Sequence, residues 1–289
     1  MIRAKSSKTG DIVIAIICFL LILICLLPLL NILARSLSSA EALIKNEVML
    51  WPVGFNFDAY KQVLGDASYT WSLAWTAILT VICTVVSMVM TTICAYPLTY
   101  DHLKGRKFFN TMMIITMYFS AGTIPMYLLM NSMKLLDNPL VLIIPNCLSV
   151  FNVIIMRSFL YGIPESLRES AELDGAGPIR TLVSIYLPLS TPVIATLSLF
   201  YAVGRWNGFS DALMYMKDKT YYPIQLMLYN ILKSMSSIDY SLPDSGAVPG
   251  LAETIKAATV MFATVPILLV YPWLQKYFIA GVTIGAVKG

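Results

Sequence analysis

The chain has 289 residues, of which 58% are hydrophobic and only 12% are charged. A soluble domain carries about twice that charged fraction, so the composition excludes an ordinary soluble protein. The net charge of +4 is too small to indicate nucleic-acid binding, and one histidine, His102, gives no material for histidine-based metal or triad chemistry. The five cysteines lie in apolar runs without metal-ligand or redox spacing. We therefore predict no catalytic residue and no metal site.

The apolar residues form six runs that are each long enough to cross a membrane. A hydrocarbon core about 30 Å thick needs roughly 20 apolar residues of helix. Helix is favoured because lipid offers the backbone no hydrogen-bond partner. The predicted spans, in chain order, are 12–33, 72–98, 108–130, 139–161, 190–209 and 257–280. The sequence predicts an all-α, polytopic membrane protein in which residues 1–289 form a single transmembrane domain.

Basic residues predict the orientation of the spans. With the N-terminus on the inner side, the inner segments carry Arg3, Lys5, Lys8, Lys104, Arg106, Lys107, Arg168, Arg180, Lys276 and Lys288. The outer segments carry a similar number of basic residues but are far longer. Basic density in short loops orients a membrane protein, so we expect both termini on the inner, cytoplasmic side.

The predicted spans lack two features of other transporters. None contains an internal Asp or Glu, whereas proton- and sodium-coupled transporters usually place acidic groups at mid-membrane. The chain also has no G-x-x-x-x-G-K-[ST] phosphate loop. If transport is active, another subunit must hydrolyse the nucleotide. Six helices alone are also few to enclose a transport cavity, and a second six-helix subunit would complete it.

The segment 163–188 lies between the fourth and fifth spans and predicts two short helices joined by a turn. Pro164 suits a first helical position, where no backbone donor is needed. Gly175 is the expected left-handed cap, Pro178 restarts a helix, and Pro188 is expected to end it. These residues alone leave two interpretations open. The segment is either a connecting loop with ordinary caps or a docking surface, which its length favours.

The same segment resembles the EAA loop of ABC importer permeases. That pattern is E-A-A, three residues, G, nine residues, and I-x-L-P. Here Glu169-Ser170-Ala171 is followed by three residues and Gly175, and nine more lead to Ile185, with Leu187 and Pro188 in register. Every spacing fits, and the one departure is Ser170 in place of Ala.

The resemblance implies a function and a set of partners. In that family the first helix of the loop is a coupling helix that docks on an ATPase subunit and moves with it. It implies that Glu169 contacts a basic residue of the ATPase, and that Ala171, Asp174, Gly175 and Ala176 pack at or shape the joint. It also implies two ATPase subunits that bind ATP and Mg, a homologous second permease, an extracytoplasmic solute-binding protein, no cofactor in this chain, and a bacterial cytoplasmic membrane.

The wider chain is similar to the maltose-type carbohydrate permeases. The Asp-Gly-Ala-Gly turn and Trp206-Asn207 at the outer end of the fifth span are typical of them. The stretches 120–125, 135–139 and 151–159 look like a subgroup that serves complex oligosaccharides, including alginate and other polysaccharide fragments. The implied substrate is therefore a sugar, in particular an oligosaccharide.

Sugar recognition needs aromatic faces and hydrogen-bonding side chains along a cavity. The candidates by type and depth are Tyr118, Asn152, Trp206 and Asn207, with Arg205 if the substrate is acidic. Each has a structural alternative. The aromatic residues equally suit packing, Asn152 equally suits a tie between helices, and the partner permease can hold most sugar contacts.

Two competing functions stay open at this stage. The EAA pattern is shared by ABC permeases for other solutes, such as phosphate, peptides or polyamines. A membrane enzyme or a secondary transporter belongs to a different class. The acid-free spans and the lack of a His, Cys or Asp cluster speak against that class.

Overall fold

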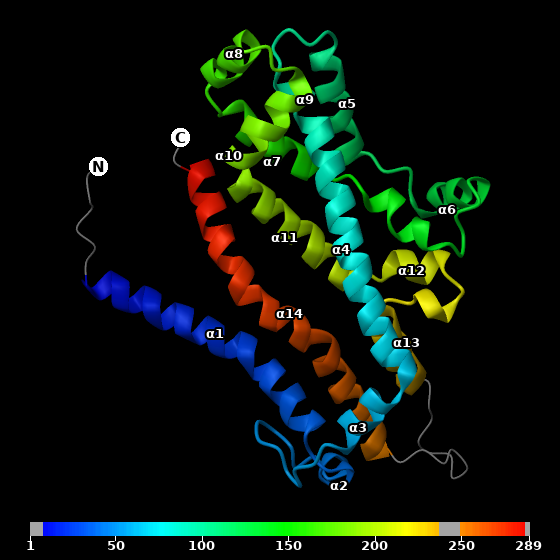
Figure 1. Cartoon of the computed structure of the whole chain (residues 1–289). Helices are drawn as coiled ribbons and strands as arrows, with labels where there is room; N and C mark the ends of the chain where they lie inside the picture. The colour runs from blue at the N-terminus through cyan, green and yellow to red at the C-terminus, as the bar shows by residue number, and fades with distance from the viewer. Residues whose placement is uncertain (1–7, 237–248, 287–289) are drawn as a thin grey trace. The chain divides into compact units, whose positions relative to one another are not determined.

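The computed structural model describes residues 8–236 and 249–286, and these fold into helices and connecting loops (Figure 1). The longer helices are α1 (Lys8–Ser36), α3 (Asp58–Gly65), α4 (Ala67–Ala95), α5 (Arg106–Tyr118), α6 (Thr123–Ser132), α7 (Val150–Tyr161), α8 (Glu165–Leu173), α11 (Thr191–Asn207), α13 (Ile224–Ser236) and α14 (Pro249–Ala286). The short elements are α2 (Ala40–Ile44), η1 (Pro97–Thr99), η2 (Pro139–Leu142), η3 (Ile144–Asn146), α9 (Pro178–Thr181), the π-helical η4 (Leu182–Tyr186), α10 (Leu187–Leu189), α12 (Ser210–Tyr215) and η5 (Lys219–Tyr221). The all-α membrane fold is confirmed for the described residues.

The predicted spans correspond to two kinds of helix. In the part of the chain that the structure describes, three are continuous and apolar enough to cross a membrane, at Gly10–Ser36, Ala67–Thr99 and Gly250–Val270. The other three are pairs of helices bent at a short break: α5 with α6 by 114°, η2–η3 with α7 by 48°, and α9–α10 with α11 by 83°. Up to six spans result if each bent pair is one span, so the number of spans stays a prediction.

Local backbone chemistry accounts for the three bends. Gly122 precedes α6 with φ of +90°, which a residue with a side chain rarely adopts. Pro145 lies in the 3₁₀ turn η3 before α7, where it withholds a backbone donor. Ser190 separates α10 from α11 with φ of −92° and ψ of 6°, and Pro192 in the first turn of α11 has no backbone N–H to continue the helical hydrogen bonds. Gly122 and Pro145 lie inside the predicted spans 108–130 and 139–161, and hydropathy, which is continuous across both positions, does not reveal how far the helices bend there.

The described residues group into two compact units. The first contains α1, α2, α3, most of α13 and the first part of α14. Its contacts include the Arg35–Glu253 ion pair at 2.7 Å and a cluster of Ala59, Val63 and Ala258. Gly250 is required at the start of α14, because a Cβ there would lie 2.1 Å from the Ala40 carbonyl oxygen. The unit is therefore closely packed where α1 ends.

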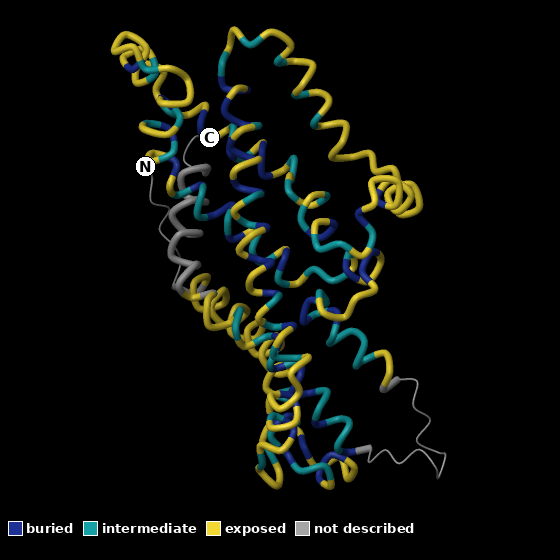
Figure 2. The backbone as a smooth tube through the Cα atoms, turned by 45° about the vertical axis from the view of Figure 1, so that its right-hand side comes forward, coloured by how far each residue is buried: buried dark blue, intermediate teal, exposed yellow. Residues whose placement is uncertain are grey.

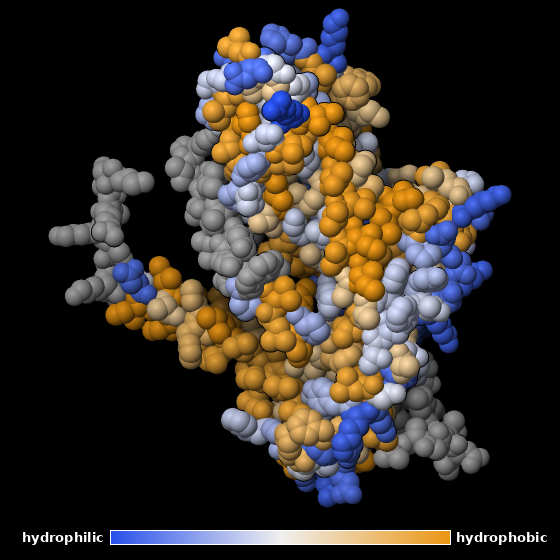
Figure 3. Space-filling view, viewed as in Figure 1, coloured by the Kyte–Doolittle hydropathy of each residue, from blue (hydrophilic) through white to orange (hydrophobic). Residues whose placement is uncertain are grey.

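The second unit runs from Trp71 to Met227 and is completed by the last part of α14. Its core joins α4, α7 and α11 through buried side chains: Met88, Ala95, Tyr96, Val153, Met156, Leu160, Tyr186, Val193 and Leu197. The buried face of α4 is rich in small hydroxyl residues, among them Ser72, Thr76 and Thr91. Such residues let helix backbones approach closely inside a membrane. In the space-filling view, the surface over the upper half of α4 is largely hydrophobic (Figure 3).

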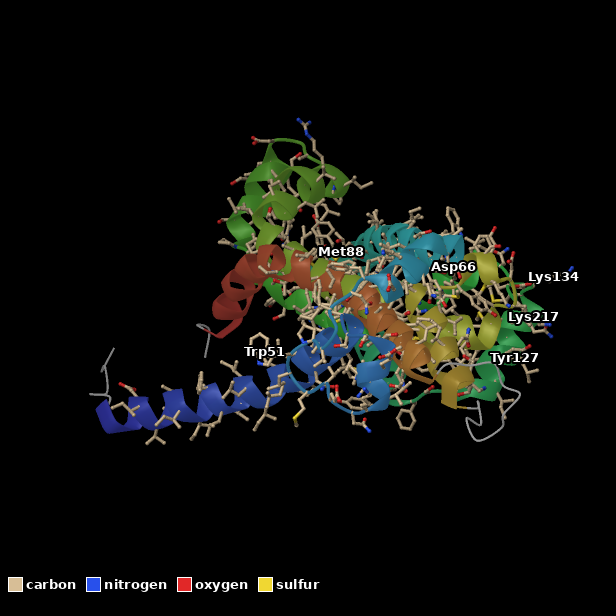
Figure 4. All side chains as sticks on the ribbon, turned by 90° about the horizontal axis from the view of Figure 1, so that it is seen from below. Trp51, Asp66, Met88, Tyr127, Lys134 and Lys217 are labelled. Atoms are coloured by element: carbon tan, nitrogen blue, oxygen red, sulfur yellow. The ribbon has the colours of Figure 1, made fainter. Side chains whose placement is uncertain are left out.

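A turn after α6 is fixed by a single carboxylate. Asp137, with φ of +58°, accepts the backbone N–H groups of Lys217 and Asp218 at 2.8 Å each. Its own N–H donates to the Tyr215 carbonyl at 2.9 Å. Figure 4 shows Lys134 and Lys217 at the same edge, next to Tyr127. Asp137 thus ties the turn after α6 to the loop after α12.

These hydrogen bonds also set the charge behaviour of Asp137. The N–H of Asp218, followed by that of Lys217, lowers the pKa of the carboxyl from its ordinary 3.8. A lowered folded-state pKa means that the stabilisation is present above the ordinary value. It is lost as the pH falls through the lowered pKa.

We predict that Asp137→Ala loosens this turn at neutral pH. Two backbone donors lose their acceptor, so trypsin is expected to cleave after Lys134 and Lys217 faster than in the parent. Asp137→Asn keeps one side-chain oxygen and is expected to lie between the two. Equal cleavage rates in the parent and Asp137→Ala would contradict the role given to this carboxylate.

Candidate functional site

The helix α8 begins the segment 163–188, in which a turn joins two helical stretches. This segment is the elbow. Pro164 lies at its N-cap with extended ψ of 129°, and the first helical residue is Glu165. Pro164 was predicted at the first helical position, and the structure places it one residue earlier. Proline suits the N-cap as well, because its ring restricts φ, here −54°, and its missing N–H is not needed for a helical hydrogen bond at this position.

The turn after α8 has a left-handed glycine cap, as predicted. Gly175 has φ of +76°, and its N–H donates to the Glu172 carbonyl at 3.0 Å. The N–H of Ala176 donates to the Ala171 carbonyl at 2.8 Å. Together these two bonds form a Schellman motif. The second helical stretch then begins with Pro178 at its first position.

The second stretch does not end where the sequence predicted. Pro188 lies inside α10, and the helical run ends at Ser190. The π-helical turn Leu182–Tyr186 directly precedes this proline and changes the hydrogen-bond register. Pro188, which has no N–H, therefore continues the run instead of ending it. The prediction overlooked the π turn, for which the sequence carries no clear signal.

The residues predicted for coupling fall into exposed and packed groups. Glu169 and Asp174 are exposed on α8 and its cap, whereas Ala171 is buried and Ala176 is half-buried. Leu173 was not predicted, yet its side chain on α8 is 89% exposed. An exposed leucine beside exposed carboxylates makes α8 suitable for a partner surface with both apolar and basic groups.

Arg168 anchors α8 to the rest of the second unit. Its guanidinium forms ion pairs with Glu165 and, at 3.7 Å, with Glu172. It also lies over the Tyr100 ring, 4.6 Å from the centroid. The Arg168 side chain is only 12% exposed, so this contact is better shielded from water than a surface ion pair.

The anchor continues through three tyrosines. The hydroxyls of Tyr100 and Tyr96 are 2.7 Å apart, and the Tyr96 ring meets the Tyr186 ring edge-on at 5.2 Å. Tyr96 directly follows α4, and Tyr186 precedes α10 and α11. The tyrosines therefore connect α8 with the end of α4 and with the stretch that leads into α11. The sequence reasoning missed this cluster, for which the four-residue spacing of Tyr96 and Tyr100 was the available signal.

The same two helices border an open cavity of about 820 Å³. Among its lining residues, α4 contributes Cys83 and Ser87, and α11 contributes Phe200, Tyr201 and Arg205. The Tyr201 hydroxyl is held by Thr91 at 2.7 Å and by the Ser149 N–H at 3.1 Å. The cavity thus offers aromatic surface and polar groups together, which suits a polar ligand with apolar faces.

Arg205 has partners within the chain. Its guanidinium contacts both Asp211 oxygens, at 2.5 and 3.1 Å, and donates to the carbonyls of Gly208 and Leu142 at 2.9 and 3.3 Å. Asp211 also accepts from the Asn146 amide at 3.0 Å. The Arg205 and Asp211 side chains are only 6% and 15% exposed. The cation is neutralised at the cavity wall instead of standing free for an anionic ligand.

The other predicted path residues lie in different places. Asn152 is buried on α7 and lines the cavity with Arg205. Tyr118 is 75% exposed at the end of α5, outside the cavity lining. Trp206 is half-buried, and the exposed Asn207 donates to the Val203 carbonyl at 3.0 Å. The structure therefore brings together two of the five candidates. Within the described ranges, no group of three His, Cys, Asp or Glu residues could hold a metal ion.

Comparison with known proteins decides the family. Residues 76–284 match the model of the binding-protein-dependent transport system inner membrane component. The chain belongs to this family. Residues 163–188 and the cavity of this permease both lie inside the matched region.

Related proteins cover nearly the whole permease. It is 39% identical to a polygalacturonan/rhamnogalacturonan transport system permease of Bacillus subtilis strain 168, over 92% of this chain and 94% of that protein. It is 40% identical to protein LplC of the same organism, over 92% and 90%. A solved bacterial ABC transporter involved in the import of the acidic polysaccharide alginate aligns with a TM-score of 0.85 and 32% identity, covering 96% and 99%.

Proposed function

We propose that this chain is the permease subunit of an ATP-driven importer that translocates oligosaccharides by alternating access. The exposed α8 elbow with its left-handed Gly175 turn is the observation that carries the coupling role. Relatives of almost full length that serve sugar-polymer import support the substrate class. The chain itself carries out transport, and hydrolysis of ATP with Mg belongs to two separate ATPase subunits.

The proposed complex also contains a homologous second permease and an extracytoplasmic solute-binding protein. A neighbouring solved structure is an alginate ABC transporter in complex with a periplasmic protein, and at 17% identity it supports the fold alone. We propose six spans in one transmembrane domain, three of them bent, with both termini and the α8 elbow on the cytoplasmic side. Residues 1–7 and 287–289, which contain basic residues used for that orientation, lie outside the described residues.

Coupling in this proposal works through rigid contacts. The ATPase holds Glu169 and Leu173, while Ala171, Gly175 and Ala176 keep the elbow in shape and exposed Asp174 adds a polar contact. Motion passes from Arg168 through the tyrosine cluster to α4 and α11, the two helices that line the cavity. Packed elements transmit such displacements as rigid bodies.

The substrate path runs along the cavity, where Asn152 is the proposed hydrogen-bonding contact. Arg205 shapes the wall through Asp211 and is not the proposed ligand of an acidic sugar. Tyr118, Trp206 and Asn207 stay predictions for the path.

Uptake into vesicles tests this function. The chain is co-expressed with its partner permease, ATPase and binding protein, and the complex is reconstituted in lipid vesicles. We expect import of oligogalacturonides or neutral galacto-oligosaccharides that requires ATP hydrolysis. Import that persists without hydrolysis would favour a secondary transporter, and import only of phosphate, peptides or polyamines would assign a different solute.

We predict that Arg168→Ala weakens coupling without preventing assembly. The substitution removes a shielded cation–π contact worth about 1 kcal/mol, so α8 is held less firmly against Tyr100. Sugar uptake per ATP hydrolysed is expected to fall. Arg168→Lys keeps the charge but loses the planar fork and is expected to be intermediate. Unchanged coupling in Arg168→Ala would exclude this route for the motion.

A further inference from the structure

The break between α5 and α6 leaves two backbone donors without a partner among the residues that the structure describes. α5 ends at Tyr118, α6 begins at Thr123, and the two axes differ by 114°. The N–H of Gly122 reaches the Ser120 hydroxyl oxygen at 3.3 Å. Within residues 8–236 and 249–286, no hydrogen bond uses the N–H of Ser120 or Ala121, and both residues are exposed. These two donors need an acceptor that the described residues do not supply.

The length of α5 and the basic residues at its start indicate that the break lies at membrane depth. α5 has 13 residues, which at 1.5 Å per residue makes a helix about 20 Å long. It begins among Lys104, Arg106 and Lys107, which belong near the membrane surface. The hydrocarbon core is about 30 Å thick, so even a tilted α5 ends inside it. The unpaired donors are therefore in the apolar part of the membrane.

Neither lipid nor water satisfies both the backbone donors and the apolar side chains at this break. Lipid offers no acceptor, and irregular backbone is tolerated at this depth only against protein or a water-filled space. Water would satisfy the donors, but Phe119 and Ile124 are 77% and 74% exposed. Leaving such side chains in water forfeits the free energy of their burial. A protein surface with both oxygen acceptors and apolar side chains satisfies the two demands together.

Both arms of the break are held by the rest of the second unit. On α5, Asn110 accepts from the Arg157 guanidinium of α7 at 3.0 Å. On α6, the Tyr127 ring stacks on the Tyr215 ring with centroids 6.1 Å apart. Figure 2 shows exposed residues along both arms. The break is thus a preformed surface in a fixed position.

We propose that the second permease subunit covers this break. Its acceptor oxygens bind the N–H groups of Ser120 and Ala121, and its apolar side chains pack on Phe119 and Ile124. The inference rests on the two-permease assembly proposed above and adds the surface by which this chain enters it. It also explains why α5 has no buried residue within this chain.

Photo-crosslinking in the assembled complex tests the surface. Phe119→p-benzoyl-phenylalanine is suited because the side chain is exposed and aromatic, so folding is expected to be unaffected. Val85→p-benzoyl-phenylalanine is the control, since Val85 is 58% exposed on the unbroken helix α4. We expect a light-dependent adduct with the second permease at Phe119 that exceeds the control. Only lipid adducts at Phe119, in a complex that imports sugar, would overturn the inference while leaving the proposed function intact.

A thiol experiment separates protein cover from water. Ser120→Cys is treated with a water-soluble thiol reagent, and the peptide that contains residue 120 is read by mass spectrometry, which separates it from the native cysteines. We expect no modification in the complex and full modification after denaturation. Modification in the intact complex would overturn the inference. A Phe119 adduct between two copies of this chain would uphold the surface as an interface between permeases but contradict the proposed heterodimer.

Discussion

Arg205→Leu is expected to destabilise the permease by about 3–5 kcal/mol, the usual cost of removing one partner of a buried ion pair. Asp211 would keep a charge on a side chain that is only 15% exposed. The remaining Asn146 amide and Ala212 N–H, at 3.0 and 2.9 Å, compensate in part and favour the lower end of that range. Thermal unfolding of the purified complex measures the effect.

The double variant Arg205→Leu with Asp211→Leu is the matched control. It removes both charges, and well-packed apolar residues often replace a buried pair at little cost. We expect it to recover most of the lost stability and to import acidic and neutral oligosaccharides in the parental ratio. A selective loss of the import of acidic sugars would mean that Arg205 binds substrate. Unchanged thermal stability of Arg205→Leu would contradict the stabilising role of the buried ion pair.

Gly175→Val is expected to abolish sugar-stimulated ATP hydrolysis. Gly175 has φ of +76°, and this left-handed conformation costs an ordinary residue roughly 1–2 kcal/mol. A β-branched residue is a stronger outlier there. Among the described residues, no heavy atom beyond the chain neighbours of Gly175 lies within 4 Å of the position that a Cβ would take there, so the effect comes from the backbone and not from a clash. The valine variant would distort the Schellman motif that fixes α8 relative to α9.

Gly175→Asn separates backbone conformation from side-chain size. Asparagine adopts the left-handed region more readily than other non-glycine residues, so we expect stimulation close to that of the parent. ATPase assays on reconstituted complexes, with co-purification as the check on assembly, compare the two variants. Equal loss in both would indicate that the ATPase contacts Gly175 directly and leaves no room for any side chain.

The elbow could be predicted from the sequence because its signals are local. Spacing placed Glu169 on the first helix and Gly175 in the turn, and the structure confirms the left-handed cap. The π turn before Pro188 could not be predicted, because hydrogen-bond register depends on packing around Tyr186. Burial of Ala171 likewise follows from the tertiary fold and not from the pattern.

The positions of the apolar segments could be predicted from the sequence, but the directions of the helices could not. Hydropathy located every apolar run, but it carries no information on direction, so the 114° bend at Gly122 was missed. The Arg205–Asp211 pair was missed for a related reason. Asp211 lies six positions after Arg205, and the loop after α11 folds it back onto the guanidinium.

Glu169→Ala in the reconstituted complex tests whether α8 couples ATP hydrolysis to sugar import. Ser166→Ala, also exposed on α8, is the control. With all subunits still co-purifying, we predict that Glu169→Ala loses substrate-stimulated ATPase activity and uptake, while Ser166→Ala keeps both. Unchanged stimulation and uptake in Glu169→Ala would contradict the coupling role and leave the elbow as a connecting loop.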